Sequence, residues 1–307
     1  MLTFLSCPKP FTGHIGVIQR NAIVSWTRLQ PRPRILLFGD EEGTAEICEE
    51  LQLIHLPEVR RNEHRTPRFD DVLARAGEHA LPGPWCFINA DIVLLDDFAA
   101  AIATVASAGG EFLVVGQRTD LDVPAPMAFG DSGWQQQLRA AIRERGRLHG
   151  EDGIDYFVFT PGLFDPVPAL LVGRASIDNW LVFKARRRWR RVVDATHTIT
   201  AVHQNHDYAH HPGGRFGVYH GEEAQANLAA AGGHDHLFWI SDRTHRLTAA
   251  GIALDLSAVQ LRRHWDRLPV LVPSLLRPAV LLVRIIQRRI GDVLRAAGLR
   301  KPLQSRQ

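Results

Sequence analysis

Two side chains that can bind a metal stand one residue apart within an apolar stretch. Asn89 and Asp91 follow an apolar run that ends at Ile88, and a second apolar run, residues 92–95, comes directly after them. Residues i and i+2 share a face of an extended chain, so both side chains can point out of a strand end. Hard divalent cations prefer oxygen ligands and often complete their coordination with substrate phosphates. The pair predicts a cation site; the alternative is a strand-end turn satisfied by Asn and Asp.

A second polar cluster runs from His203 to Tyr208, with His210 and His211 close by. We predict that His203 and His206 supply imidazoles to the same metal or contact a phosphate. One alternative is a polar loop whose histidines bond to the backbone. Another is a zinc hydrolase, although the usual zinc pattern of two histidines on a helix with an intervening Glu is absent.

Two further acids stand where catalysis could use them. Asp178 opens an apolar pattern with helical spacing, so it is either the N-cap of a helix or a general base that deprotonates an acceptor hydroxyl. A helix N-terminus would favour its charged form. Asp155 opens the aromatic strand 156–159, and we predict that it holds a sugar hydroxyl; the alternative is that the aromatic residues are simply core.

Basic and amide side chains follow the first apolar run and open the next helical pattern. Lys9 or Arg20 is placed to meet a phosphate, and Asn21 to read a base. Each signal is weak alone, since exposed Lys and Arg side chains are usually solvated.

Strand and helix signals alternate over the first 116 residues and must position these groups. Strands are predicted at 2–7, 34–38, 53–56, 85–89 and 112–116, and helices at 18–29, 41–51, 69–79 and 96–107, the last capped by Asp96. Alternation of this kind predicts an α/β fold with a doubly wound, mostly parallel sheet and helices on both faces. Ligands of such sheets bind beyond the carboxyl ends of the strands, where Pro8, Asp40, Asp91 and Arg118 fall.

Composition limits the class of protein. The 307 residues suffice for one large domain with an appendage, and 45% hydrophobic residues exclude global disorder. A net charge of +3 argues against a nucleic-acid binder. Three widely spaced cysteines are typical of reduced, buried thiols in a cytoplasmic protein. The N-terminus lacks the pattern of a signal peptide, and no apolar run reaches the ~20 residues of a spanning helix.

The composition shifts near residue 254 to Leu, Val, Ile and Arg with little acid. We therefore predict a catalytic domain at 1–253 and a basic amphipathic helical tail at 254–307. The stretch 279–299 carries four arginines and one acid, Asp292. Such a helix either lies on an anionic membrane surface, here the inner face of the cytoplasmic membrane, or packs on the protein.

In their order and spacing, several segments together resemble a family of bacterial and plant GT-A-like nucleotide-diphospho-sugar transferases. The resemblance covers roughly residues 1–247. It rests on Pro8-Lys9-Pro10-Phe11, Gln19-Arg20-Asn21-Ala22-Ile23, Phe38-Gly39-Asp40-Glu41, Ile88-Asn89-Ala90-Asp91-Ile92, Gly116-Gln117-Arg118, Asp155-Tyr156-Phe157, Asp178-Asn179-Trp180-Leu181 and His203-Gln204-Asn205-His206-Asp207-Tyr208. Asn89 departs from a full D-x-D motif, and Arg65 stands where Gly is expected.

The resemblance implies a GT-A-type fold, a nucleotide-sugar donor, Mn²⁺ or Mg²⁺ at the D-x-D-like position, and transfer to a hydroxyl of a glycan or another acceptor, as in cell-surface polysaccharide synthesis. We predict an inverting displacement with Asp178 as the base. The predicted contacts are Asp91, Asn89, His206 and His203 for the metal; Asp155, Tyr156, Arg118, Arg174, Asn179 and Trp180 for the donor sugar; and Pro8, Phe11, Arg20, Asn21 and Asp40 for the nucleotide.

Two other functions stay open at this stage. A sugar-phosphate nucleotidyltransferase uses a similar sheet but needs a Gly-rich basic loop after the first strand, and residues 7–13 contain a single Gly. A catalytically silent nucleotide-sugar-binding module would explain the amide at position 89.

Overall fold

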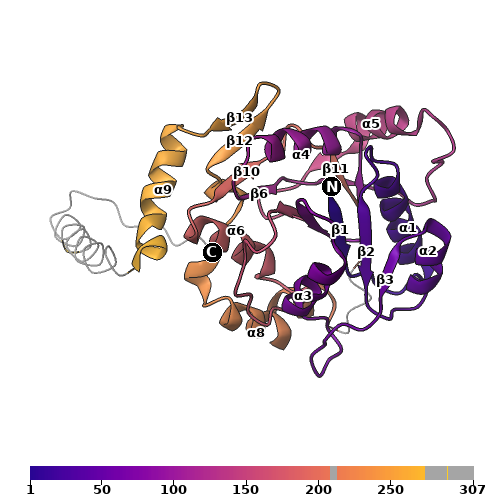
Figure 1. Cartoon of the computed structure of the whole chain (residues 1–307), viewed down its shortest axis with the longest axis horizontal. Coiled ribbons are helices and arrows are strands. Elements are labelled where there is room, and N and C mark those ends of the chain that lie inside the picture. The colour runs from indigo at the N-terminus through magenta and orange to yellow at the C-terminus, as the bar shows by residue number, and fades with distance from the viewer. Residues whose placement is uncertain (208–212, 274–288, 290–307) are drawn as a thin grey trace, which may run out of the picture. The chain divides into compact units, whose positions relative to one another are not determined.

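The computed structural model describes residues 1–207, 213–273 and 289 (Figure 1). The chain divides into two compact units, Met1–Leu256 and Ser257–Gln307. In the second unit, helix α9 (Ala258–Leu271) begins after Ser257, whose side chain accepts a hydrogen bond from the backbone N–H of Gln260. This contact is a side-chain N-cap and explains where the helix starts.

The main sheet of the first unit has nine strands within the described residues, in the order β13-β12-β10-β6-β9-β4-β1-β2-β3. Most neighbours are parallel, whereas β9 runs antiparallel between β4 and β6, and β13 runs antiparallel at one edge. The bounds are β1 Thr3–Ser6, β2 Arg34–Phe38, β3 Ile54–Leu56, β4 Trp85–Ile88, β6 Phe112–Val115, β9 Tyr156–Phe159, β10 Arg191–Asp194, β12 His245–Thr248 and β13 Gly251–Leu254.

A second, smaller sheet carries part of the polar chemistry. Its order is β5 (Ile92–Leu94), β11 (Ala201–Gln204), β7 (Thr119–Leu121) and β8 (Arg147–Leu148). Strand β11 pairs antiparallel with β5 and parallel with β7, which places His203 between Ile92 on one side and Asp120 on the other. The chain that follows Asp91 is thereby joined to the histidine strand.

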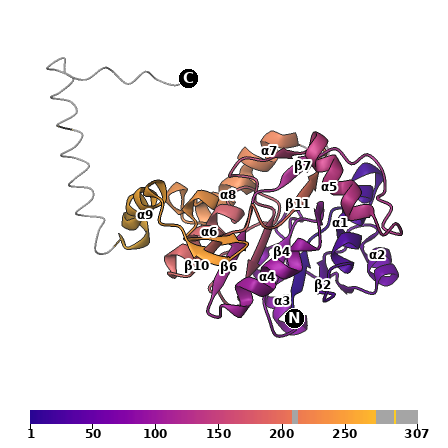
Figure 2. The same cartoon turned by 90° about the horizontal axis from the view of Figure 1, so that it is seen from above.

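Helices flank the main sheet, as Figures 1 and 2 show. Alternate side chains of each strand point to opposite faces. On one face Phe4 packs against Trp26 and Phe98, and on the other Phe87 packs against Phe69. The helices of this unit are α1 Gly13–Thr27, α2 Thr44–Leu51, α3 Phe69–His79, α4 Asp97–Ser107, α5 Trp134–Arg145, α6 Ile177–Arg187, α7 Gly214–His220 and α8 Glu222–Ala230.

The predicted fold class, an α/β fold with a mostly parallel sheet flanked by helices, is confirmed. Strand β2 and helix α3 have the predicted bounds. Asp96 occupies the predicted N-cap position of α4, which ends at Ser107 as predicted, but its side chain makes no cap hydrogen bond and instead pairs with Arg139, Oδ1 to Nη2, at 2.7 Å. Strand β9 matches the predicted aromatic strand 156–159, but its antiparallel direction was not anticipated, and neither were β13 and the second sheet.

The three cysteines carry no disulfide; Cys48 and Cys86 are buried and Cys7 is partly buried. Among the described residues, no helix is both long enough and apolar enough to cross a membrane. The predicted amphipathic stretch 279–299 lies outside the described residues apart from position 289, and so do Tyr208, His210 and His211.

Candidate functional site

A cavity of about 400 Å³ runs along the edge of the main sheet where the parallel strands end. Asp155 precedes β9, and because β9 is antiparallel to β4 its amino end lies at this same edge. Asp91 follows β4, Lys9 follows β1 and Glu41 follows β2, and all four residues line the cavity. The topology therefore brings together polar residues that are far apart in sequence, as expected for a doubly wound sheet.

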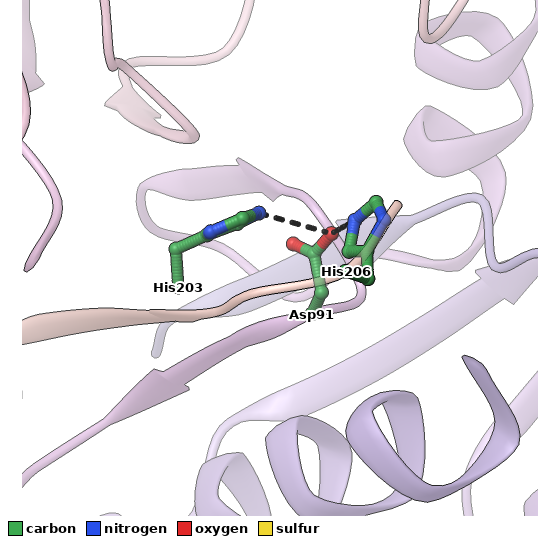
Figure 3. A group of neighbouring side chains, drawn as sticks. All are labelled: Asp91, His203 and His206. Carbon is green, nitrogen blue, oxygen red and sulfur yellow. Dashed lines mark hydrogen bonds and ion pairs between the residues drawn. The ribbon is translucent and has the colours of Figure 1, made fainter. Parts of the chain in front are cut away.

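Three groups with metal-binding atoms meet in this cavity: Asp91, His203 and His206, whose donor atoms all lie within 4.8 Å of one another. Both imidazoles turn their Nε2 atoms toward the carboxylate (Figure 3). Asp91 Oδ2 is 3.1 Å from His206 Nε2 and 3.8 Å from His203 Nε2. Figure 3 shows the carboxylate between the two rings, and two imidazoles with one carboxylate form a donor set for a divalent cation.

The second oxygen of Asp91 tests whether a cation fits here. Asp91 Oδ1 is buried and has no hydrogen-bond partner among the described residues. A buried carboxylate oxygen without a partner is costly, and an ion is one of the few groups that can satisfy it. Burial alone would raise the pKa of Asp91, but the His206 hydrogen bond and the charges of His203 and Lys9 hold it well below its usual range. The residue is therefore ionised and suited to a cation.

Asn89 lines the same cavity as Asp91, but its side-chain amide is engaged by another carboxylate. The strand ends at Ile88, and a turn closed by a hydrogen bond from Ile92 N–H to Asn89 C=O follows, so the chain is not extended from Asn89 to Asp91 as predicted. The Asn89 amide instead donates to Asp155 Oδ1, with Nδ2 2.5 Å away, and its backbone N–H donates to Asp155 C=O. Its role in the structure is to hold Asp155.

Asp155 is 7% exposed and is held from both sides. Its Oδ1 accepts from Asn89, and its Oδ2 accepts from Arg118 Nη1 at 2.6 Å. The same Arg118 donates through Nε to Asp120 Oδ1 at 2.9 Å. Arg118 thus joins the predicted sugar-binding carboxylate to a second carboxylate on β7, and one guanidinium fixes both.

Asp178 lines the cavity from the first turn of α6. It is not the N-cap, because Ser176 occupies that position and makes no side-chain cap bond. Burial, with a smaller contribution from the charge of Asp155, raises the pKa of Asp178 to about 8, although Arg118 acts in the opposite direction. A carboxyl group with this pKa can accept a proton near neutral pH, as a general base must.

Lys9 is a cation of the cavity that was only weakly indicated by its position after the first strand. Gln19 clamps its backbone, accepting from Lys9 N–H at 2.6 Å and donating to Lys9 C=O at 2.7 Å. Within the described part of the chain, its ammonium makes no hydrogen bond or ion pair. Burial lowers the pKa of Lys9, while Asp91 and Asp155 favour its charged form.

Gln204 is a residue that the sequence reasoning missed. It is fully buried, and its amide donates to the C=O of Asp91 at 3.0 Å and to the C=O of Ile18 at 2.7 Å. It therefore fixes the turn that presents the Asp91 carboxylate. Its place within the histidine motif was the only available signal.

Of the predicted nucleotide contacts, Pro8 lines the cavity and the other four do not. Arg20 is exposed and pairs with Glu50 on α2. Asn21 is buried, donating to Gln204 Oε1 and Ala125 C=O and accepting from Met127 N–H. Phe11 packs against the core cluster, and Asp40 forms ion pairs with Arg61 and Arg65 outside the cavity wall.

Three of the six predicted sugar contacts line the cavity, and the other three lie in the protein core or away from the cavity. Arg118, Asp155 and Arg174 line the cavity, Arg174 being tied to Glu223 by a 2.7 Å ion pair. Tyr156 points to the opposite face of β9 and packs against Phe98 in the core. Asn179 donates to the C=O of Phe238, and Trp180 is buried against Phe164. Neither residue lines the cavity, because successive side chains of α6 point in different directions and the two after Asp178 point away from it.

Arg65, found where the resemblance led us to expect Gly, lines the cavity with a φ of +62°. This left-handed conformation favours glycine and is strained for a residue with a Cβ. The loop therefore keeps a glycine-like shape, and the Arg65 guanidinium pairs with Asp40 at 3.2 Å.

No protein-family model matches the sequence, and no similar curated protein was found. Solved structures with similar folds include glucosyl-3-phosphoglycerate synthase from Mycobacterium tuberculosis in complex with Mn²⁺, UDP and phosphoglyceric acid: 13% identity, TM-score 0.46, covering 76% of this chain and 79% of that one. S. aureus TarS 1–349 gives 10% identity, a TM-score of 0.45 and coverages of 66% and 60%. The mannosyltransferase PcManGT from Pyrobaculum calidifontis in complex with GDP-Man and Mn²⁺ gives 15% identity, a TM-score of 0.38, and coverage of 66% of this chain and 56% of that one. These proteins are nucleotide-sugar glycosyltransferases. With sequence identities of 10–15%, the similarity to them concerns the fold alone.

Proposed function

We propose that the protein is a metal-dependent glycosyltransferase that moves a sugar from a nucleoside diphosphate to an acceptor hydroxyl with inversion. The observation that carries the proposal is the buried, unpartnered Oδ1 of Asp91 beside His203 and His206. These groups open into the same cavity as two more carboxylates, Asp155 and Asp178. A cation site and a titratable acid in one cavity at the edge of a parallel sheet suit transfer from a diphosphate.

Asp91, His203 and His206 would hold the cation. When bound, a divalent ion neutralises the diphosphate so that it can depart as a leaving group. Two imidazoles make Mn²⁺ a better fit than Mg²⁺, which prefers an all-oxygen environment. The Lys9 ammonium interacts electrostatically with Asp91 and is unpaired among the described residues. It adds a second positive group for the phosphates.

Asp155 and Asp178 would act on the sugar and the acceptor. Asp155 is pre-positioned by Asn89 and Arg118, which restrict its rotation, as suits an acceptor for sugar hydroxyls. Asp178 would take the proton of the acceptor hydroxyl as that oxygen attacks the anomeric carbon. Attack from the side opposite the departing diphosphate would give inversion.

A donor screen with and without metal tests the proposal. Protein stripped with EDTA is incubated with a panel of nucleoside-diphosphate sugars, and diphosphate release and thermal stability are measured. We expect one donor class to be turned over with Mn²⁺, more slowly with Mg²⁺, and only at background rate in EDTA. A donor present at 100 times its Kd should stabilise the fold by about 2.7 kcal/mol. Full turnover in EDTA would exclude metal assistance.

The same screen separates the other two functions. Stabilisation by a donor without turnover of any member of the panel would favour a silent binding module. Pyrophosphate release from a nucleoside triphosphate and a sugar phosphate would favour a nucleotidyltransferase.

The ligand set also supports a zinc hydrolase as a second candidate. Two histidines and one carboxylate with an open position are typical of catalytic zinc sites. The two functions differ in what the substrate must carry. Zinc-loaded protein that hydrolyses esters or amides lacking a nucleotide would favour the hydrolase, whereas a strict requirement for a nucleoside diphosphate supports the transferase.

The proposal includes peripheral contact of the tail with an anionic membrane surface. Its support is the sequence of 279–299, in which Arg284, Arg288, Arg289 and Arg295 interrupt an aliphatic stretch. Replacing these four arginines by Glu in the full-length chain should abolish co-sedimentation with phosphatidylglycerol vesicles. Neutral phosphatidylcholine vesicles serve as the control, and equal partitioning of both proteins would contradict the membrane contact.

A further inference from the structure

The structure assigns Asp120, a residue of the second sheet, the role of a positioning residue that orients the metal-binding imidazole of His203. This inference rests on the proposed metal site and extends it to a carboxylate that does not line the cavity. Asp120 stands directly across from His203 in the parallel pairing of β7 with β11. Asp120 Oδ1 lies 3.2 Å from His203 Nδ1, the ring nitrogen opposite the one that faces Asp91.

The position of Asp120 decides which nitrogen of His203 can bind a cation. A carboxylate beside Nδ1 favours the proton on that nitrogen and leaves the lone pair on Nε2. Nε2 is the atom that points toward Asp91. The 3.2 Å approach to Nδ1 is close but not aligned as a full hydrogen bond, so the effect is chiefly electrostatic. Without the carboxylate, both tautomers and a flipped ring become accessible.

Asp120 is itself held in a single orientation. His149, which follows β8, lies with Nδ1 2.6 Å from Asp120 Oδ2. Arg118 donates to Oδ1 at 2.9 Å. Each carboxylate oxygen therefore has a fixed neighbour, and side-chain exposure is only 18%. A group that orients another must be fixed in this way, since partners of metal ligands act by limiting the ring to one pose.

The same contacts join the metal site to the sugar-binding carboxylate. Arg118 reaches from Asp120 to Asp155, so His203, Asp120, Arg118 and Asp155 form one continuous chain of charged and polar groups. A shift of the imidazole is resisted by contacts that also fix Asp155. The second sheet thus provides the support for both parts of the site.

The Mn²⁺ affinity of the metal-free protein, measured by electron paramagnetic resonance, tests the inference. Asp120→Asn keeps the shape of the side chain and removes its charge. We expect Mn²⁺ binding to weaken by about 10- to 100-fold, the range known for partners of metal ligands. Asp152→Asn is the matched control: Asp152 is exposed, lies 4.0 Å from the other nitrogen of His149, and should leave Mn²⁺ affinity unchanged.

A double-mutant cycle separates positioning from a general structural effect. If Asp120 acts through His203, Asp120→Asn should cost no further affinity in a His203→Gln background but should keep its full effect in a His206→Gln background. Equal losses in both backgrounds, or wild-type affinity in Asp120→Asn, would overturn the inference while leaving the metal site intact. If the wild-type protein does not bind Mn²⁺, both the metal site and the inference are wrong. If it binds Mn²⁺ but transfers no sugar, only the proposed function is contradicted.

Discussion

Replacing Asp91 by Asn is expected to reduce sugar transfer by about a thousandfold or more while leaving the fold intact. Asp91 is the only carboxylate of the three-residue donor set, and its Oδ1 has no other partner among the described residues. An amide is neutral and binds a hard cation far more weakly than a carboxylate. Losing about 4 kcal/mol of charge stabilisation at the departing diphosphate corresponds to this change in rate.

The measurement is kcat/KM for the donor over a range of Mn²⁺ concentrations, with Mn²⁺ affinity determined separately. High Mn²⁺ should restore part of the activity of Asp91→Asn, because the two imidazoles remain. Asp96→Asn is the matched control, since Asp96 is an exposed acid five residues along the chain that pairs only with Arg139. Wild-type transfer by Asp91→Asn would remove the basis of the proposed mechanism.

Local patterns predicted the parts of the fold that local forces determine. Helix α3 and strand β2 have their predicted bounds because an amphipathic repeat and a continuous apolar run fix them over a few residues. The second sheet escaped prediction because β5, β7 and β8 are only two or three residues long. Their pairing with β11 is set by tertiary contact rather than by any periodicity.

The site shows the same division between local and long-range information. His203, His206 and Asp91 were grouped by residue type, and the structure brings them together. The i, i+2 argument that paired Asn89 with Asp91 holds only for extended chain, whereas a turn begins at Asn89. Tyr156 was misplaced because alternation along β9 sends it to the face opposite Asp155. Asp120 was absent from the predicted contacts because only strand pairing brings it beside His203.

Asp178→Asn is expected to lower transfer by about 10²- to 10⁴-fold and to abolish its pH dependence near neutrality. Burial and the charge of Asp155 raise the pKa of Asp178 to about 8, so in the wild-type protein only about a tenth of the molecules carry the ionised base at pH 7. We expect kcat/KM to rise about tenfold per pH unit below this pKa and to level off above it. The variant should show a low, flat profile over the same range.

The same substitution should change stability in the opposite direction, which distinguishes a catalytic acid from a structural one. Because the folded-state pKa of Asp178 lies above its unfolded value, the folded state binds more protons between about pH 4 and pH 8, and stability falls as pH rises through this window. Asp178→Asn removes that penalty, so its Tm should exceed that of the wild type at pH 9 and match it near pH 4.

Asp70→Asn is the matched control for this comparison. Asp70 is the second residue of α3, as Asp178 is the second residue of α6, but it pairs with Arg68 at 2.7 Å and does not line the cavity that contains Asp178. Its replacement should leave transfer and the pH profile unchanged. An Asp178→Asn variant that is inactive but more stable at high pH would show that Asp178 serves catalysis and lowers the stability of the folded state. An active Asp178→Asn enzyme with the wild-type pH profile would assign the base to another group.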